Sequence, residues 1–231
     1  MKQPVIDYRK LRLNNFFKEY RHLLLLLWWP IYGVAFTYIE RYRYVKMYNP
    51  VWSLTDYKIP FCEYFLIPYL FWFIFIIGML LFTLLFDISE FKRFMYFTMI
   101  TYSITIAIYL IFPTCNILRP LEFERQNTFT DVIRLYYRMD TSTNVCPSLH
   151  VIGSIAVMLA GLHSKAVKSP ITKALIVLSA ILIGISTVFV KQHSILDIIW
   201  AMPVCLLGYL IVYFRIPSRK KTLQQDYPGY T

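Results

Sequence analysis

Two short segments of the chain combine residue types that support covalent catalysis. The first is Cys146-Pro147-Ser148-Leu149-His150, and the second runs from Lys191 to Asp197. Together they hold two of the four histidines. Asp197 is the only acidic residue in the sequence between Asp140 and Asp226. Imidazoles act as nucleophiles and proton carriers, and a carboxylate can orient them. Because both segments border apolar runs, their ionisable groups are candidates for a functional site at a membrane.

His193 and Asp197 are separated by one helical turn in the sequence. On a helix this spacing places both side chains on one face. The carboxylate can then hold one ring nitrogen and leave the other free as a nucleophile or base. The alternative interpretation is a helix-capping Asp beside a surface His, because short motifs also arise by chance. The second segment shifts the balance toward the functional interpretation.

The Pro147–His150 segment is typical of a helix start. Pro147 suits the first helical position, and Thr143 or Asn144 can cap the helix. A helix start presents backbone N–H groups to an anion, and Ser148 adds a hydroxyl. An ordinary membrane helix that begins with proline accounts for Pro147 and Ser148 but leaves His150 unexplained.

Two cations accompany these segments. Arg119 and Lys191 are able to form an electrostatic clamp on a phosphoryl group, which is what phosphoryl transfer chiefly requires. Both also suit a plain role as basic residues at a membrane interface. His22 and His163 are expected at the interfaces, and we assign them no function.

The elements that position these residues are predicted from composition and hydropathy. The chain is 58% hydrophobic and 16% charged, whereas soluble domains carry about 25% charged residues. Apolar runs of membrane-spanning length recur along it. We expect an all-α fold, a polytopic six-span transmembrane helix bundle. The expected spans are 23–39, 66–86, 94–118, 148–164, 174–190 and 198–214.

Three regions follow from these spans. Residues 1–21 are expected to form a basic interfacial N-terminal segment, 22–215 a six-span membrane catalytic domain and 216–231 a cytoplasmic tail. The majority of the 24 Lys and Arg residues fall on the side of both termini. The positive-inside rule then predicts cytoplasmic termini and an outward-facing site. This distribution accounts for the net charge of +11 without nucleic-acid binding. We expect a plasma-membrane protein without a nucleic-acid partner.

At this point the residues resemble a known family, the membrane-embedded type 2 phosphatidic acid phosphatases. That family shares a fold core with vanadium haloperoxidases and glucose-6-phosphatase, and its motifs are K-x6-R-P, P-S-G-H and S-R-x5-H-x3-D. Arg119-Pro120 is similar to the end of the first motif, and Pro147–His150 to the second. Ser186-Thr187, His193 and Asp197 are similar to the third. The resemblance covers roughly residues 90–215.

The chain departs from the family motifs at three positions. Phe112 stands where the first motif has Lys, Leu149 where the second has Gly, and Thr187 where the third has Arg. Lys191 is the natural substitute for a missing cation. The pattern also resembles the branch of inositol-phosphorylceramide and sphingomyelin synthases, whose members transfer a phospho-headgroup to an acceptor alcohol. Hydrolysis and transfer therefore both stay open.

The resemblance implies a two-step covalent mechanism. His193 is the expected nucleophile, Asp197 orients its ring, and His150 passes the proton. Arg119, Ser148 and Lys191 are the expected phosphate-binding residues. The implied substrate is a lipid or polyprenyl phosphate whose apolar tail lies in the membrane, and no cofactor or metal is implied.

Two other classes of function remain as alternatives. His150, His193 and Asp197 have the stoichiometry of a two-His, one-carboxylate metal site, although neighbouring cations would repel a metal ion. A transporter or a non-enzymatic membrane bundle is the other alternative. The sequence leaves open a disulfide among Cys62, Cys115 and Cys146, and it does not determine the oligomeric state.

Overall fold

The structure, a computed structural model, describes residues 5–12 and 15–214. Its main helices are α1 (Trp28–Thr37), α3 (Leu66–Phe86), α4 (Ile88–Ile111), α6 (Leu149–His163), α7 (Pro170–Phe189) and α8 (Ile195–Tyr209). Two shorter helices, α2 (Leu54–Lys58) and α5 (Thr128–Met139), and two strands, β1 (Asn49–Pro50) and β2 (Thr114–Cys115), lie in the connections. The predicted all-α class is confirmed, since each strand has only two residues.

Five helical runs in the described part of the chain are long and apolar enough to cross a membrane. They are Phe16–Tyr42, Glu63–Phe86, Ile88–Ile111, Pro170–Phe189 and Ile195–Phe214. This architecture is that of an integral membrane protein. The predicted sixth span is α6, whose 15 residues give a length of about 22 Å, less than the ~30 Å hydrocarbon core. A count of six long spans is therefore not confirmed.

The ends of two predicted spans differ from those observed. The run predicted over 94–118 forms a helix over Ile88–Ile111, because Asp87 caps its start by accepting a hydrogen bond from the Glu90 backbone. Pro113 follows its end and disfavours helical geometry at Phe112. The first helical run begins at Phe16, inside the predicted N-terminal segment. The predicted tail, 216–231, lies outside the described residues.

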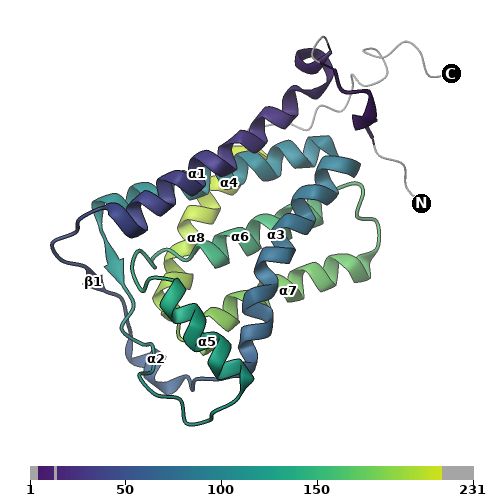
Figure 1. Cartoon of the computed structure of the whole chain (residues 1–231). Helices are drawn as coiled ribbons and strands as arrows, with labels where there is room; N and C mark the ends of the chain where they lie inside the picture. The colour runs from purple at the N-terminus through teal and green to yellow at the C-terminus, as the bar shows by residue number, and fades with distance from the viewer. Residues whose placement is uncertain (1–4, 13–14, 215–231) are drawn as a thin grey trace.

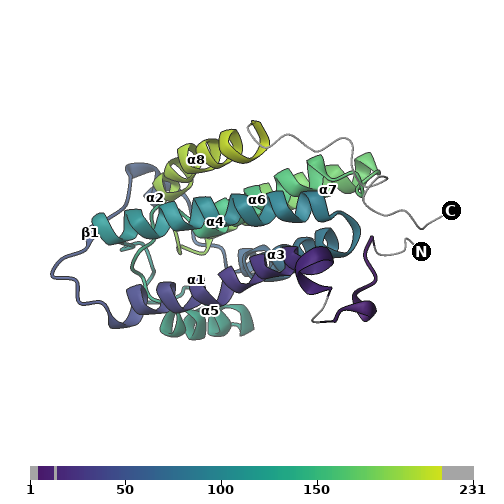
Figure 2. The ribbon, with the colours of Figure 1, turned by 90° about the horizontal axis from the view of Figure 1, so that it is seen from above.

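Helix α6 occupies the centre of the bundle. It packs against α3, α4, α7 and α8, and Figures 1 and 2 show it enclosed between these longer helices. Gly153 makes the close approach possible, because a Cβ there would lie 2.6 Å from both Ile76 Cδ1 and Tyr102 Oη. Small residues permit such packing between membrane helices. The shortness of α6 is compatible with burial by its neighbours.

The connecting elements gather at one end of the bundle. Figure 1 shows β1, α2 and α5 there, beside the starts of α6 and α8. The parallel strands pair Asn49 with Thr114 and Pro50 with Cys115. This end also receives the C-terminal ends of α4 and α7. The predicted site residues, from Arg119 to Asp197, lie at this end of the bundle. The helical structure of α2 and α5 was not predicted.

Candidate active site

The turn between α7 and α8 positions His193. Helix α7 ends at Phe189, and Lys191 adopts a left-handed conformation with φ 53°. The N–H groups of Gln192 and His193 then both donate to the Thr187 carbonyl, at 3.0 and 3.1 Å. A left-handed residue commonly ends a helix in this way, but it is usually Gly. The strained backbone of Lys191 therefore fixes the direction in which His193 leaves the turn.

Asp197 binds the imidazole of His193 directly. The distance from Asp197 Oδ2 to His193 Nδ1 is 2.8 Å, and the same oxygen accepts the Ser194 N–H at 3.0 Å. His193 is 8% exposed and Asp197 is fully buried. Because a carboxylate accepts hydrogen bonds, it places the proton on Nδ1 and leaves Nε2 available for chemistry.

The predicted shared helix face is not the reason for this contact. His193 lies before α8, whose N-cap is Ser194, and Asp197 completes a capping box with that serine. The chain enters the helix in an extended conformation, so the His193 ring reaches Asp197 from outside the helix. The catalytic and the capping interpretations of Asp197 therefore coincide in one side chain.

The start of α6 brings His150 to the same place. Ser148 is the N-cap, and its hydroxyl oxygen accepts the Val151 N–H at 3.5 Å. The predicted helix start is therefore wrong in detail, because Pro147 precedes the cap and neither Thr143 nor Asn144 caps the helix. The Ser148 N–H donates to the Asp197 carbonyl at 3.1 Å, which joins the first turns of α6 and α8.

Aromatic side chains from α3 hold the His150 ring. Tyr69 stacks on it with a centroid distance of 4.5 Å, and Trp72 contacts it at 4.4 Å. The centroids of His150 and His193 are 5.8 Å apart in an edge-on arrangement. Within the described structure, the buried His150 Nε2 has no hydrogen-bond partner. Tyr69 and Trp72 carry no motif that would have identified them from the sequence.

Arg119 lies at the edge of the site, held mainly by backbone carbonyls. Its guanidinium donates to the carbonyls of Tyr137, Asp140 and Thr141 at 2.9–3.2 Å. It also approaches the Asp140 carboxylate at 3.5 Å. Burial raises the pKa of Asp140 from its usual value of 3.8, and Arg119 opposes this shift. The α5 C-terminus and the following loop therefore fix Arg119 in place.

Gln192 connects Arg119 to the histidine turn, a role that the sequence did not reveal. Arg119 Nη2 donates to Gln192 Oε1 at 2.5 Å. Since guanidinium has no acceptor, the amide oxygen must face Arg119 and the amide nitrogen must face away. That nitrogen is buried and has no partner among the described residues. Gln192 thus presents a donor beside His193.

Lys191 binds the end of α2 through its side chain. Its ammonium donates to the carbonyls of Asp56 at 2.7 Å and Ile59 at 2.5 Å, at the end of α2. Burial lowers the pKa of Lys191, and the nearby Asp56 opposes that shift. Two of its three donors are therefore used to hold α2. The predicted role of Lys191 in phosphate binding stays a prediction.

Asp56 is the most connected acid at this end, and sequence reasoning missed it. The carboxylate is fully buried and accepts hydrogen bonds from Ser194 Oγ at 2.6 Å and from the Ile195 N–H at 2.8 Å. It also caps α2 by accepting the Ser53 N–H at 2.7 Å. Asp56 therefore fixes the start of α8, and with it the position of Asp197.

Thr187 and Phe112, which stand where the family motifs have Arg and Lys, have different surroundings. Thr187 is buried, and its hydroxyl donates to the Gly184 carbonyl at 2.8 Å. Phe112 is 54% exposed at the end of α4. Neither supplies a charge to the site, and Arg119 is the cation that reaches the histidine turn from another element, through Gln192.

Other candidate groups gain no support from the geometry. Across the described ranges, no three His, Cys, Asp or Glu side chains are arranged to hold a metal ion. All four cysteines are free thiols. Cys146 lies beside Asp197, and burial together with that carboxylate raises the pKa of its thiol.

Comparison with known proteins adds no assignment to this geometry. No family model, curated protein or solved structure matches the chain. The chemical evidence for a function is therefore the pair of neighbouring imidazoles, the buried carboxylate and the surrounding donors.

Proposed function

We propose that the protein is a membrane lipid phosphatase, or polyprenyl phosphate phosphatase, that acts through a phosphohistidine intermediate. The observation that carries the proposal is the His193–Asp197 hydrogen bond of 2.8 Å with the His150 ring beside it. A ring held at Nδ1 by a buried carboxylate is oriented for attack through Nε2. The motif resemblance to type 2 phosphatidic acid phosphatases leads to the same assignment.

In the first step, the lone pair on His193 Nε2 attacks the phosphorus atom. A P–N bond forms as the P–O bond to the lipid breaks, and protonated His150 gives its proton to the departing oxygen. Asp197 stabilises the positive charge that develops on the His193 ring. The products of this step are the lipid alcohol and phosphorylated His193.

In the second step, His150 takes a proton from water as the water oxygen attacks phosphorus. The P–O bond forms, the P–N bond breaks, and phosphate leaves with His193 restored. If an alcohol enters instead of water, the same steps transfer the phosphoryl or phospho-headgroup to that alcohol. The acceptor distinguishes the phosphatase from the phosphotransferase alternative.

Stabilisation of the phosphoryl oxygens is assigned to groups around the histidines. Ser148 uses its oxygen lone pair to cap α6, so its O–H is still able to donate. The first turn of α6 adds backbone N–H groups, and Arg119 acts together with Gln192. Because Lys191 is engaged by α2, we propose that it contributes mainly by holding the turn.

A substrate panel tests this function. The purified chain in detergent is given phosphatidate, a polyprenyl diphosphate and a lysophosphatidate, each with and without a long-chain alcohol acceptor. Release of inorganic phosphate supports hydrolysis, whereas a new phosphorylated lipid that appears only with the alcohol supports transfer. The absence of both products from every substrate would contradict the enzymatic proposal.

We further propose that the site faces outward across the plasma membrane, with both termini in the cytoplasm. This orientation follows from the distribution of Lys and Arg. Single cysteines at Ser142 and Ser169, introduced into a cysteine-free chain, should label from opposite sides of intact cells, with position 142 accessible from outside. Labelling of both positions from outside would contradict the orientation.

A further inference from the structure

Helix α1 is the least enclosed of the long apolar helices. Only 11% of the most apolar window in Phe16–Tyr42 is buried, compared with 28% to 44% in the other four runs. One face of α1 packs on α4, where Trp28, Trp29 and Tyr32 surround the Tyr102 ring. The opposite face is open, and Val34 is 73% exposed.

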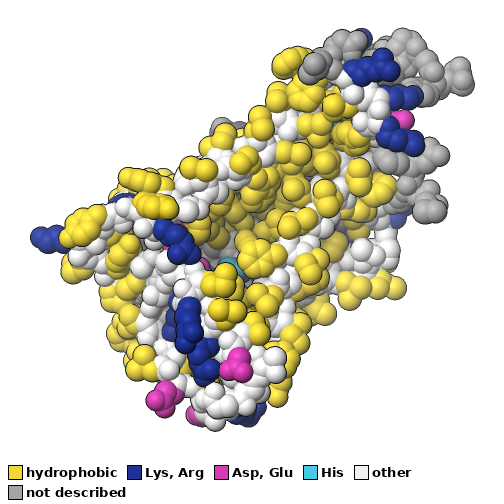
Figure 3. Space-filling view, in the orientation of Figure 1, with side chains coloured by type: hydrophobic (Ala, Val, Ile, Leu, Met, Phe, Trp, Pro, Cys, Tyr) yellow, Lys and Arg dark blue, Asp and Glu magenta, His cyan; other side chains and the backbone are white. Residues whose placement is uncertain are grey.

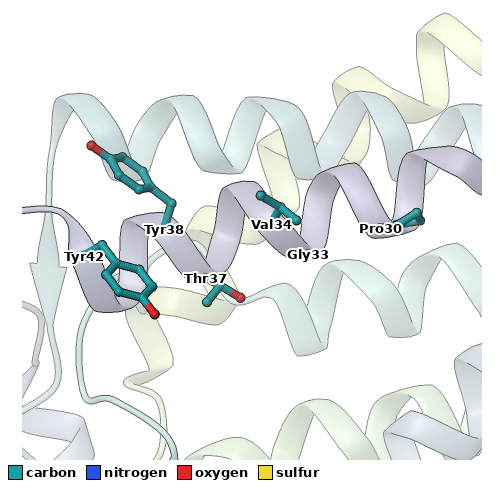
Figure 4. A pocket seen from close by; sticks show the side chains of 6 residues that line it. All are labelled: Pro30, Gly33, Val34, Thr37, Tyr38 and Tyr42. Carbon is teal, nitrogen blue, oxygen red and sulfur yellow. The ribbon is translucent and has the colours of Figure 1, made fainter.

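The open face of α1, together with the helical turn that continues it to Tyr42, carries a wide-open apolar groove of about 480 Å³. Figure 4 shows the residues that line it, which are Pro30, Gly33, Val34, Thr37, Tyr38 and Tyr42. None of them is charged. Gly33 leaves the middle of the groove empty, because a Cβ built there would meet no atom within 4 Å.

A polar cavity of about 160 Å³ continues from the groove. Thr37 lines both, and the cavity is completed by Phe36, Glu40, Arg41, Asp140 and Thr141. The Asp140 carboxylate lies 3.5 Å from Arg119 Nη2, which in turn contacts Gln192, the residue before His193. A continuous set of contacts therefore leads from the apolar groove to the histidine turn.

The molecular surface shows the same order, with an apolar area followed by a polar one. Figure 3 shows a broad hydrophobic area on this face that ends at a hollow, where histidine and acidic surface are visible next to Lys and Arg side chains. An amphiphile that lies along this face would place its apolar part on the hydrophobic area and its polar part in the hollow. The change from apolar to polar surface along this face thus matches an amphiphile.

We propose that the groove on α1 binds the apolar chain of the lipid phosphate substrate and guides its phosphate past Thr37 toward His193. This inference rests on the proposed function and specifies how the substrate is recognised. From Pro30 to Tyr42 the groove runs roughly 18 Å along the helix, more than half of the ~30 Å hydrocarbon core. The substrate is therefore a lipid with a long chain that enters sideways from the membrane.

A substitution at Gly33 tests the groove with a matched control. Gly33→Leu fills the groove, and Gly78→Leu adds the same side chain on α3, where a Cβ also meets no atom within 4 Å. Gly33→Leu should reduce kcat/KM for a long-chain alkyl phosphate by about tenfold, a factor equivalent to ~1.4 kcal/mol. Gly78→Leu should leave hydrolysis of the long-chain substrate and of para-nitrophenyl phosphate unchanged. The loss in Gly33→Leu should be larger for the long-chain substrate than for para-nitrophenyl phosphate, which has no chain to place. Equal effects of the two variants on the long-chain substrate, or no effect, would overturn the proposal.

Binding without turnover separates this inference from the proposed function. The full-length His193→Ala variant in lipid nanodiscs is irradiated with an alkyl phosphate that carries a diazirine on its chain, and labelled peptides are identified by mass spectrometry. Labels should fall within residues 30–42 and disappear when Gly33→Leu is added. This result would support the groove even if the wild-type chain released no phosphate. Labels spread evenly over all apolar helices would contradict the inference. A disulfide-linked dimer of a Gly33→Cys variant would also contradict it, because a second copy of the chain would then cover the groove.

Discussion

The two ends of the helical bundle contain similar residue types in different arrangements. At the site end, His193 binds Asp197 and lies beside His150. At the opposite end, His163 Nδ1 lies 2.9 Å from the Leu159 carbonyl of its own helix, and its ring contacts Tyr213. The buried Glu90 accepts a hydrogen bond from Tyr213 Oη at 2.7 Å and lies 3.6 Å from Arg93.

This difference shows that the arrangement, rather than the residue types, gives one end its chemistry. A histidine and a buried acid are present at both ends, but the described contacts pair them only at the site end. There the acid is held by helix capping and its histidine by a turn, so both partners are fixed before a substrate arrives. Such preorganisation is the main requirement of electrostatic catalysis. Matched substitutions at the two ends can therefore test the comparison.

The largest expected effect concerns the histidines, His193 at the site end and His163 at the opposite end. His193→Ala should reduce phosphate release by about 10⁴-fold or more, because no nucleophile remains. His163→Ala, at the opposite end, should retain activity within a few-fold. Initial rates on one lipid phosphate at equal protein concentration provide the measurement. Comparable losses in the two variants would remove the distinction between the ends.

The two buried acids, Asp197 and Glu90, should differ in their effect on kcat, but by a smaller factor than the two histidines. Asp197→Asn keeps the size of the side chain but weakens control of the His193 tautomer, and we expect kcat to fall by about 10²–10⁴-fold. Glu90→Gln replaces the buried acid of the opposite end and should leave kcat within a few-fold. Steady-state kinetics at a temperature where both variants are folded would test this, and full activity of Asp197→Asn would contradict the orienting role.

Removal of the capping acids should affect stability more than chemistry. Asp56→Asn disrupts a buried network at the start of α8 and should reduce the free energy of unfolding by about 1–3 kcal/mol. Asp87→Ala removes the cap of α4 at the opposite end and should cost about 1 kcal/mol. Only Asp56→Asn should also lower kcat, because Asp197 follows the turn that Asp56 fixes. Thermal unfolding in detergent and kinetics together distinguish the two.

The smallest expected effect concerns pH and Asp140. Because burial raises the pKa of Asp140 above 3.8, the folded state holds this proton more tightly than the unfolded state. Stability from this group is therefore greatest below pH 3.8 and declines as pH rises through the raised pKa. Asp140→Asn does not titrate, so its melting temperature should improve relative to wild type between pH 4 and 7. A difference that stays constant or reverses with pH would contradict the shift.

Hydropathy runs and capping patterns in the sequence predicted the positions of several helices. The uncharged run 66–86 coincides with α3, and 148–164 is close to α6. Ser194 and Asp197 have the spacing of a capping box, a local signal that also explains their positions. The grouping of His150, His193 and Asp197 was predicted from their residue types and spacing.

The contacts that were missed depend on residues distant in the sequence. Asp56 reaches Ser194 across 138 positions, and nothing near Asp56 indicates this partner. The direction of Lys191 depends on a left-handed backbone conformation, which a lysine rarely adopts. Arg119 was identified as a cation, but the carbonyls that hold it belong to α5 and the following loop. Tertiary structure therefore decided which predicted groups can face a substrate.

Trapping of the covalent intermediate tests the central claim most directly. Rapid quenching with a phosphorus-labelled, activated ester should give an acid-labile, base-stable label on His193 of the wild-type chain, identified by mass spectrometry. His193→Ala should give none, whereas His150→Ala should still accumulate label, because a good leaving group needs little protonation, and should then stall. Label that persists in His193→Ala and is lost in His150→Ala would reverse the assigned roles, and turnover unaffected in both variants would contradict the catalytic account.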